Sequence, residues 1–231
     1  MKKSIWCLPL AVCLLAASAP SDPPFDLLLT GGRVVDGSGA PWFAADVGVR
    51  DGKIAEVGVL TGRSAKRTID AKGLVIAPGF IDLLGQSEYT ALVDKRVASK
   101  ITQGITTEVT GEGESIAPFN DRVLAGRKDL YAKYGYTPEF RTIGGFLDTL
   151  EKRGTAINLG TFVGAGSVRD LVIGQADRRA TPEELAKMRD VVDQAMREGA
   201  LGVSSSLQYV PDMANAFRQC RVLLSKALPA R

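Results

Sequence analysis

Two glutamates in a short glycine-rich loop are the first candidates for chemistry. Glu112 and Glu114 lie in the run Gly111-Glu112-Gly113-Glu114-Ser115, directly after the β-branched stretch 104–110. That stretch predicts a strand, and the carboxyl ends of strands are where β/α barrels carry out reactions. Glu112 is the stronger site candidate of the two. The alternative reading is a solvated acidic loop that has no site role.

Further polar residues follow two other predicted strands. Gln86 and Glu88 come after the stretch that ends at Asp82, and we expect them to line a pocket, whereas Asp82 itself is expected to close the strand end. Ser205 and Tyr209 follow a later stretch and are candidates for contacting a substrate carboxylate or hydrogen-bonding a substrate. Neighbouring serines share that position: Ser204 and Ser206.

The sequence of 231 residues contains no histidine. This absence excludes a Ser-His-Asp triad, an imidazole general base and a histidine-ligated metal within the chain. Without a base, none of the serines is an activated nucleophile. Cys220 has no histidine partner and is not a candidate nucleophile. Arg169 either pairs with a carboxylate or, as the simpler reading, forms a surface ion pair.

Composition favours an ordinary globular protein, with 45% hydrophobic and 24% charged residues and a net charge of +3. The excess of basic residues is concentrated at the two ends of the chain, because residues 214–231 contain four basic residues and no acidic residue. The remaining residues are slightly acidic. A nucleic-acid partner is therefore not expected.

The first residues are typical of a secretory signal peptide. Lys2 and Lys3 precede an apolar stretch that is too short for a comfortable membrane span, and small residues follow it. We expect residues 1–19 to be removed and residues 20–25 to form a stiff linker, which places the protein in the periplasm or outside the cell, with no membrane association. A lipoprotein anchor at Cys13 is the less favoured alternative.

Residues 26–73 predict a small antiparallel β unit, the first portion of a β-sandwich. Short alternating stretches are separated by turn signals, of which Asp51-Gly52 is the strongest hairpin signal. The pair Gly31-Gly32 is expected to end the first strand. About 45 residues bury too little apolar surface to be stable alone, so this unit should pack on something else.

From residue 74 the pattern changes to alternating strands and helices, which indicates a parallel sheet. A Thr181-Pro182-Glu183-Glu184 capping box opens the clearest helix, and Gly164-Ala165-Gly166 is expected to be flexible backbone. The predicted fold class is α/β, with residues 74–213 forming about the first four β/α units of a TIM-type (β/α)8 barrel. The basic tail 214–231 is anomalous. The half barrel has two unpaired strand edges, which would favour self-association. The predicted strands are 74–83, 104–110, 156–163 and 201–205, and the other predicted helices are 89–102, 121–134 and 142–152.

Several motifs together resemble the amidohydrolase superfamily and, within it, the N-acyl-D-amino-acid deacylases. They are DLLLTGGRVVD (26–36), GSGAPW (37–42), DVGVRDGKI (46–54), APGFID (77–82), GITT (104–107) and GALGVSS (199–205). The resemblance implies a (β/α)8 barrel beside a small β-sandwich. It also implies a metal-bound water, usually on zinc, that hydrolyses the amide bond of an N-acyl-D-amino acid.

The sequence departs from the family pattern where metal ligands are expected. The family's His-x-His pair is replaced by Leu84 and Gln86, and the loop that often carries a metal-binding cysteine offers Glu112 instead. Leu84 cannot bind a metal, and Gln86 is a weak ligand. The later histidines and the catalytic Asp of the family have no counterpart in this chain. We therefore expect a truncated, weakly active or inactive form, from a subgroup whose one-metal site uses Glu112 and later residues.

Two alternatives remain open at this stage. A cyclic-amide hydrolase of the same superfamily shares the fold, although it normally uses the missing His-x-His pair. A non-catalytic binding protein that kept the fold and lost the chemistry is the other alternative. In each enzyme reading, Ser205, Tyr209 and Gln86 are the substrate-binding candidates and Glu112 is the metal candidate.

Overall fold

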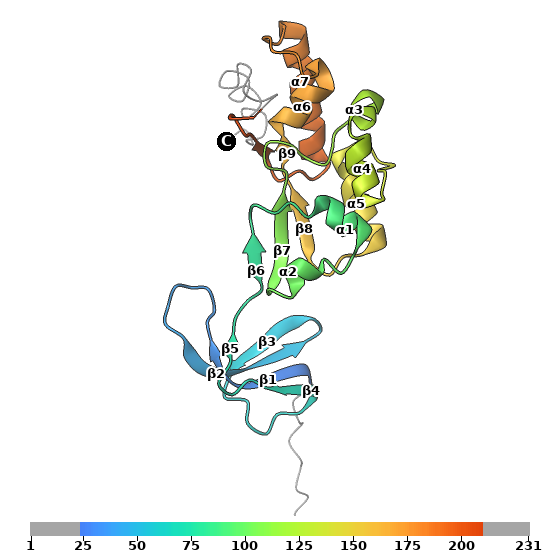
Figure 1. Cartoon of the computed structure of the whole chain (residues 1–231). Coiled ribbons are helices and arrows are strands. Elements are labelled where there is room, and N and C mark those ends of the chain that lie inside the picture. The colour runs from blue at the N-terminus through green and yellow to red at the C-terminus, as the bar shows by residue number, and fades with distance from the viewer. Residues whose placement is uncertain (1–23, 210–231) are drawn as a thin grey trace, which may run out of the picture. The chain divides into compact units, whose positions relative to one another are not determined.

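The computed structural model describes residues 24–209, which divide into two compact units, the first ending at Pro78 and the second beginning at Gly79 (Figure 1). The predicted signal peptide, the linker residues before Pro24 and the basic tail lie outside the described residues. The last predicted linker residue, Phe25, is fully buried and begins the first strand. The first unit also extends to Pro78, beyond the 26–73 expected from the sequence.

The first unit is a five-stranded mixed sheet with the order β3-β2-β1-β4, in which β5 also pairs with β1. The β1–β2 and β2–β3 pairs are antiparallel, but β4 and β5 run parallel to β1. The purely antiparallel prediction was therefore wrong, because the chain crosses over after β3 and returns on the far side of β1. The strands are β1 (Phe25–Val34), β2 (Phe43–Arg50), β3 (Lys53–Gly58), β4 (Ala65–Asp70) and β5 (Val75–Ile76).

Gly31-Gly32 does not end a strand but forms an irregularity inside β1. The register with β2 shifts between Leu29 and Gly32, and the Gly31 N–H donates to Asp46 Oδ1 at 2.7 Å. Gly31 has a φ of +70°, which glycine adopts without strain. The predicted hairpin at Asp51-Gly52 is confirmed, since both residues have positive φ between β2 and β3.

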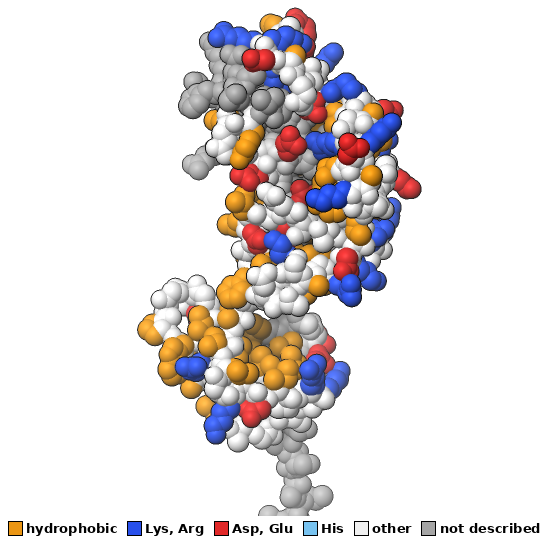
Figure 2. All heavy atoms as spheres, in the orientation of Figure 1, with side chains coloured by type: hydrophobic (Ala, Val, Ile, Leu, Met, Phe, Trp, Pro, Cys, Tyr) orange, Lys and Arg blue, Asp and Glu red, His pale blue; other side chains and the backbone are white. Residues whose placement is uncertain are grey.

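The first unit has two small buried clusters, one around Phe25 and one around Val34. Many large apolar side chains stay exposed on it, and Figure 2 shows apolar side chains gathered on one face of this unit. These clusters agree with the expectation that this unit buries little apolar surface. The exposed residues include Trp42, Phe43, Ile54, Val57, Val59, Leu74 and Val75.

The second unit has parallel strand pairs, as the β/α alternation predicted. One sheet has the order β6-β7-β8, and a separate pair joins β9 to β10. The predicted strand 74–83 is divided at Pro78-Gly79 between the two units, and the predicted strand 156–163 is divided at Phe162. The strands are β6 (Phe80–Asp82), β7 (Ile105–Thr110), β8 (Asn158–Thr161), β9 (Val163–Gly164) and β10 (Val203–Ser204).

Helices cover this second unit, and two of the predicted helices are each broken in two. Between α1 and α2, Asp94 Oδ1 accepts the Arg96 N–H at 3.1 Å, and Val97 has a left-handed φ of +42°. Both features end a helix. The second break lies at Arg127. The helices are α1 (Glu88–Val93), α2 (Ala98–Ile101), α3 (Asp121–Gly126), α4 (Lys128–Tyr134), α5 (Ile143–Arg153), α6 (Ala165–Ile173) and α7 (Pro182–Arg197).

The core of the second unit lies between its helices and strands. Ile143 and Phe146 of α5 are fully buried, and Thr142 caps that helix by accepting the Gly145 N–H at 3.2 Å. The prediction of flexible backbone at Gly164-Ala165-Gly166 was wrong, because Ala165 begins α6 and all three residues are buried. These three residues pack against the loop that carries Glu112, and this packing excludes water from them.

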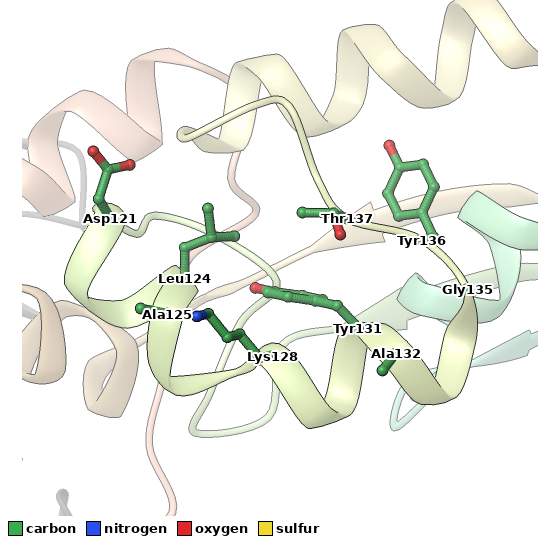
Figure 3. Close-up of a pocket in the computed structure, with 9 residues that line it drawn as sticks. All are labelled: Asp121, Leu124, Ala125, Lys128, Tyr131, Ala132, Gly135, Tyr136 and Thr137. Atoms are coloured by element: carbon green, nitrogen blue, oxygen red, sulfur yellow. The ribbon is translucent and has the colours of Figure 1, made fainter.

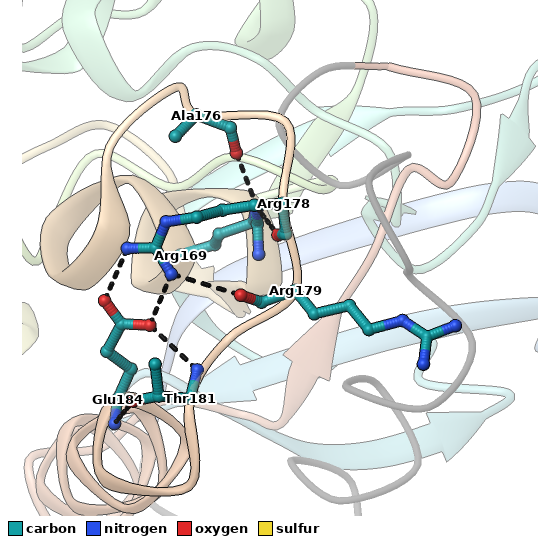
Figure 4. A network of polar contacts seen from close by, with 6 residues as sticks. All are labelled: Arg169, Ala176, Arg178, Arg179, Thr181 and Glu184. Atoms are coloured by element: carbon teal, nitrogen blue, oxygen red, sulfur yellow. Dashed lines mark hydrogen bonds and ion pairs between the residues drawn. The ribbon is translucent and has the colours of Figure 1, made fainter.

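The predicted capping box at the start of α7 is confirmed, with Thr181 and Glu184 exchanging hydrogen bonds. Figure 4 shows the surrounding network, in which Arg178 binds both oxygens of Glu184 at 2.6 and 2.7 Å. The simpler expectation, that Arg169 forms an ion pair at the surface, was wrong. It is 1% exposed and donates to the carbonyl oxygens of Ala176 and Arg178 at 2.8 and 2.7 Å.

A pH effect on stability follows from this network. Arg178 and the Thr181 N–H lower the pKa of Glu184 to about 2, from an ordinary value of 4.5. A lowered pKa in the folded state stabilises the fold above about pH 4.5, and this contribution is lost as the pH falls toward about 2. Acid unfolding followed by circular dichroism should therefore be less steep between these pH values in Glu184→Gln, since glutamine keeps the capping box. Equal slopes in the two proteins would contradict this prediction.

Candidate functional site

A cavity of about 160 Å³ lies at the carboxyl ends of the strands of the second unit. Its walls are formed by residues at or directly after the ends of β6, β7 and β8 and by the end of β10. The lining is mostly apolar, with one carboxylate and two hydroxyl groups among its side chains. The lining residues are Leu83, Leu84, Gly85, Val109, Thr110, Glu112, Phe162 and Ser204. The arrangement suits a small ligand that has an apolar part and a few polar groups.

Ser204 holds the loop that carries Glu112. Its Oγ donates to the Gly111 carbonyl oxygen and accepts the Gly113 N–H at 3.0 Å. Gly111 has a φ of +92°, and a Cβ there would lie 2.4 Å from the Phe162 carbonyl oxygen. The loop therefore needs glycine at this position, and Ser204 is occupied by the backbone of the loop.

The other side of the same loop is fixed to β9 and α6. The Ser115 N–H donates to Ser167 Oγ at 2.8 Å, and Ser115 Oγ accepts the Gly164 N–H at 3.0 Å. The Gly166 N–H donates to the Gly113 carbonyl oxygen at 3.0 Å. These bonds are buried, so residues 111–115 form a rigid support for the exposed Glu112 side chain.

The structure brings only some of the sequence candidates together. Glu112 lines the cavity, whereas Gln86, Ser205 and Tyr209 are exposed and are not among its lining residues. Tyr209 is 61% exposed, and its N–H donates to the Ser206 carbonyl oxygen at 2.9 Å. Glu114 points elsewhere and lies 3.5 Å from the Arg127 guanidinium.

Two titratable side chains at the start of α1 have shifted pKa values. Burial raises the pKa of Tyr89 to about 12, in spite of the nearby Arg127 guanidinium. Burial also raises the pKa of Glu88, and the neighbouring Glu108 carboxylate adds to this increase. Neither side chain lines the cavity. Glu88, which we expected in a pocket, is instead partly covered at the start of α1.

Sequence reasoning missed Glu108 and Lys100. Glu108 is fully buried in β7, and Lys100 Nζ lies 3.6 Å from its Oε2. The available signal was the charge itself, since an acidic residue within a β-branched strand is unusual and needs a partner.

The described residues do not by themselves fit a zinc ion. Within residues 24–209, no group of three or more histidine, cysteine, aspartate or glutamate side chains could hold a metal. Glu112 is the one carboxylate that lines the cavity, and Leu84 has no donor atom.

A second, larger groove of about 570 Å³ lies along α3 and α4 (Figure 3). Leu124 and Tyr131 line it from α3 and α4 with the Lys128 side chain beside them, and Tyr136 lines it from the segment after α4. It belongs to the helical layer and not to the strand ends.

Comparison with known proteins identifies relatives of this chain. No family model matches the chain. D-aminoacylase from Alcaligenes xylosoxydans xylosoxydans is 40% identical over 195 residues, which cover 84% of this chain and 40% of the relative. The chain is a homologue of the N-acyl-D-amino-acid deacylases. It spans about 40% of the length of this curated relative.

Two solved structures of deacylases agree with this assignment. N-acyl-D-glutamate deacylase from Bordetella bronchiseptica, solved with zinc and a phosphonate that mimics the tetrahedral intermediate, has a TM-score of 0.78 and 35% identity. The match covers 87% of this chain and 42% of the other. D-aminoacylase, described with a binuclear metal centre, one-metal activation and second-metal attenuation, has a TM-score of 0.79 and 35% identity, covering 88% and 43%.

The predicted relation to N-acyl-D-amino-acid deacylases is therefore confirmed, as is the α/β class of an amidohydrolase. These deacylases are metal-dependent hydrolases of amide bonds, and zinc is present in the solved N-acyl-D-glutamate deacylase.

Proposed function

We propose that residues 79–209 supply the first four β/α units of a barrel that hydrolyses the amide bond of N-acyl-D-amino acids, and that the 231-residue chain by itself has little or no activity. The observation that carries the proposal is the 40% identity to D-aminoacylase over 195 residues. The cavity supports it, since it lies at the carboxyl ends of parallel strands, where barrel enzymes bind their substrates.

The cavity walls suit part of an N-acyl amino acid. Leu83, Leu84 and Phe162 offer apolar surface for an acyl chain or an amino-acid side chain. Gln86, Ser205 and Tyr209 are exposed beside the strand ends and are proposed to hydrogen-bond the polar groups of the substrate. Glu112 is the residue that this segment would contribute to a one-metal site, whose other ligands are not among the described residues.

Ligand binding tests the proposal directly. Equilibrium dialysis of the 231-residue chain should show that N-acetyl-D-leucine binds more tightly than its L enantiomer. Leu84→Asp places a carboxylate at the cavity and should weaken binding of the anionic ligand by about 10-fold, roughly 1.4 kcal/mol. Val59→Asp in the first unit, at an apolar side chain that is 87% exposed against 61% for Leu84, is the control and should leave binding unchanged. Equal binding of both enantiomers would contradict the proposal.

The non-catalytic reading is the second candidate. The observation that favours it is the lack of a metal-binding group among residues 24–209. The two readings differ in one result, the release of free D-leucine from N-acetyl-D-leucine. We expect little or no release by the 231-residue chain by itself, because residues 24–209 contain no metal-binding group. Zinc-dependent release would contradict this expectation and would exclude the non-catalytic reading.

Zinc should have little effect on the stability of this chain. A ligand that binds only the folded state at 100 times its Kd raises stability by about 2.7 kcal/mol, so a surviving site would be visible as a higher unfolding midpoint. We expect no increase that a chelator reverses. An increase that disappears in Glu112→Gln would show that the cavity still holds a metal ion.

The proposed location is the periplasm or the exterior of the cell. The N-terminal residues that suggest it lie outside the described residues. Within residues 24–209, no helix is long and apolar enough to cross a membrane. Mass spectrometry of the protein recovered from periplasm or medium should show a mature N-terminus after Ala17 or Ala19.

Self-association is proposed through the edge strand β6. Its Phe80 and Ile81 side chains are 61% and 63% exposed, and β6 pairs on one side only, with β7. An apolar edge strand is a common route to association. Sedimentation of the 231-residue chain should show species larger than a monomer.

A further inference from the structure

Glu108 is a fully buried carboxylate in the middle of the second unit. It lies in β7, opposite Asp82 of β6 and Leu159 of β8. Removing a carboxylate from water is costly unless hydrogen bonds and an opposite charge replace the water. The interactions of the buried Glu108 carboxylate therefore indicate its role in the structure.

Those interactions connect β7 to the loop that follows β6. Glu108 Oε1 accepts the Ser87 N–H at 2.8 Å, and Oε2 lies 3.6 Å from Lys100 Nζ. The same Lys100 ammonium lies 2.7 Å from Asp82 Oδ2. Asp82 Oδ1 in turn accepts the Leu84 N–H at 3.1 Å. One ammonium thus links two carboxylates, and each carboxylate binds a backbone N–H of the loop.

Gly85 makes room for this carboxylate. A Cβ at Gly85 would lie 1.9 Å from Glu108 Oε1 and 2.0 Å from Glu108 Cγ, far inside contact distance. The Gly85 N–H donates to the Val109 carbonyl oxygen at 2.9 Å, so the loop backbone is fixed directly above the Glu108 side chain. The loop is held at Leu84, Gly85 and Ser87.

This loop forms one wall of the strand-end cavity, through Leu83, Leu84 and Gly85. Glu108 itself does not line the cavity. We infer that Glu108 is a positioning residue, which together with Lys100 sets this wall and thereby the ligand affinity of the cavity. The effect on ligand affinity rests on the proposed function; the effect on the loop does not.

Hydrogen exchange of backbone amides tests the inference in the 231-residue chain. Glu108→Gln keeps the size of the side chain but turns a neutral amide toward the Lys100 ammonium. We expect the Ser87 N–H to exchange about 10-fold faster in this variant, through local opening of the loop. Exchange at Phe146, a fully buried residue of helix α5, should stay unchanged, which separates positioning from general destabilisation.

The double variant Glu108→Gln/Lys100→Met removes the ammonium that faces a neutral amide in Glu108→Gln and has Asp82 as its remaining partner. It should restore most of the protection at Ser87. Glu56→Gln, an exposed ion-pair partner of Arg63 in the first unit, is the matched control and should leave exchange at Ser87 unchanged. Unchanged exchange at Ser87 in Glu108→Gln would overturn the inference. Equal acceleration at Ser87 and Phe146 would overturn it as well, since Glu108 would then only stabilise the fold.

Equilibrium dialysis with N-acetyl-D-leucine gives the second measurement. Affinity should fall by about 10-fold in Glu108→Gln and recover in the double variant. If the unsubstituted chain does not bind N-acetyl-D-leucine, the proposed function fails, and the exchange result alone decides whether Glu108 positions the loop. If the loop opens but affinity is unchanged, the wall does not control binding, and that part of the inference fails.

Discussion

Gly164→Ala is expected to destabilise the second unit by about 3 kcal/mol, at the upper end of the usual cost of overpacking. A Cβ at Gly164 would lie 2.3 Å from the Gly113 carbonyl oxygen and 2.7 Å from Glu114 Cα. Both are backbone atoms of the loop that carries Glu112, so no side chain can move aside. The loop would have to leave its hydrogen bonds to Gly164, Ser167 and Ser204.

Urea unfolding followed by circular dichroism measures this effect. Gly126→Ala in α3 is the matched control, because no atom lies within 4 Å of the added Cβ. That substitution should be neutral or stabilising by up to about 1 kcal/mol, since alanine favours helix. If Gly164→Ala were as stable as Gly126→Ala, the described packing of the loop against β9 would be wrong.

Arg169→Met should cost about 3 kcal/mol of stability, because hydrogen bonds from a charged donor are strong and buried acceptors are costly to leave unpaired. Arg169 is 1% exposed, and its guanidinium holds the chain before α7 through the carbonyl oxygens of Ala176 and Arg178. Methionine keeps much of the volume but offers no donor. We expect a lower urea concentration at the unfolding midpoint and a less ordered chain segment at the start of α7.

Arg178→Met serves as the comparison for Arg169→Met. The Arg178 side chain is 46% exposed in its ion pair with Glu184, and exposed ion pairs contribute about 0–1 kcal/mol. Both variants remove a guanidinium group, so the difference between their urea midpoints measures how much more a buried guanidinium contributes to stability than an exposed one. Equal midpoints would contradict the buried role of Arg169.

Local signals in the sequence predicted much of this fold. The Asp51-Gly52 hairpin and the capping box at Thr181 depend on neighbouring residues, and both are confirmed. Two expectations were wrong because distant contacts decide the structure. Gly164-Ala165-Gly166 is rigid because the loop at Gly113 covers it, and β4 is parallel because it pairs with β1 across a crossover.

The candidate site was predictable in position but not in detail. Glu112 follows β7 and lines the cavity, as a residue at a strand end can. Gln86 follows β6 in the same way, but the loop turns its side chain out of the lining. That turn depends on Glu108 and Lys100, whose pairing joins β7 to α2 and leaves no local pattern in the sequence.

The central claim is that residues 79–209 form a folded unit whose strand-end cavity recognises an N-acyl-D-amino acid. Thermal unfolding of the 231-residue chain by circular dichroism, with N-acetyl-D-leucine or N-acetyl-L-leucine present, tests it most directly. We expect a cooperative transition whose midpoint rises with the D enantiomer and not with the L enantiomer. A transition that neither enantiomer shifts, or the lack of a cooperative transition, would contradict it.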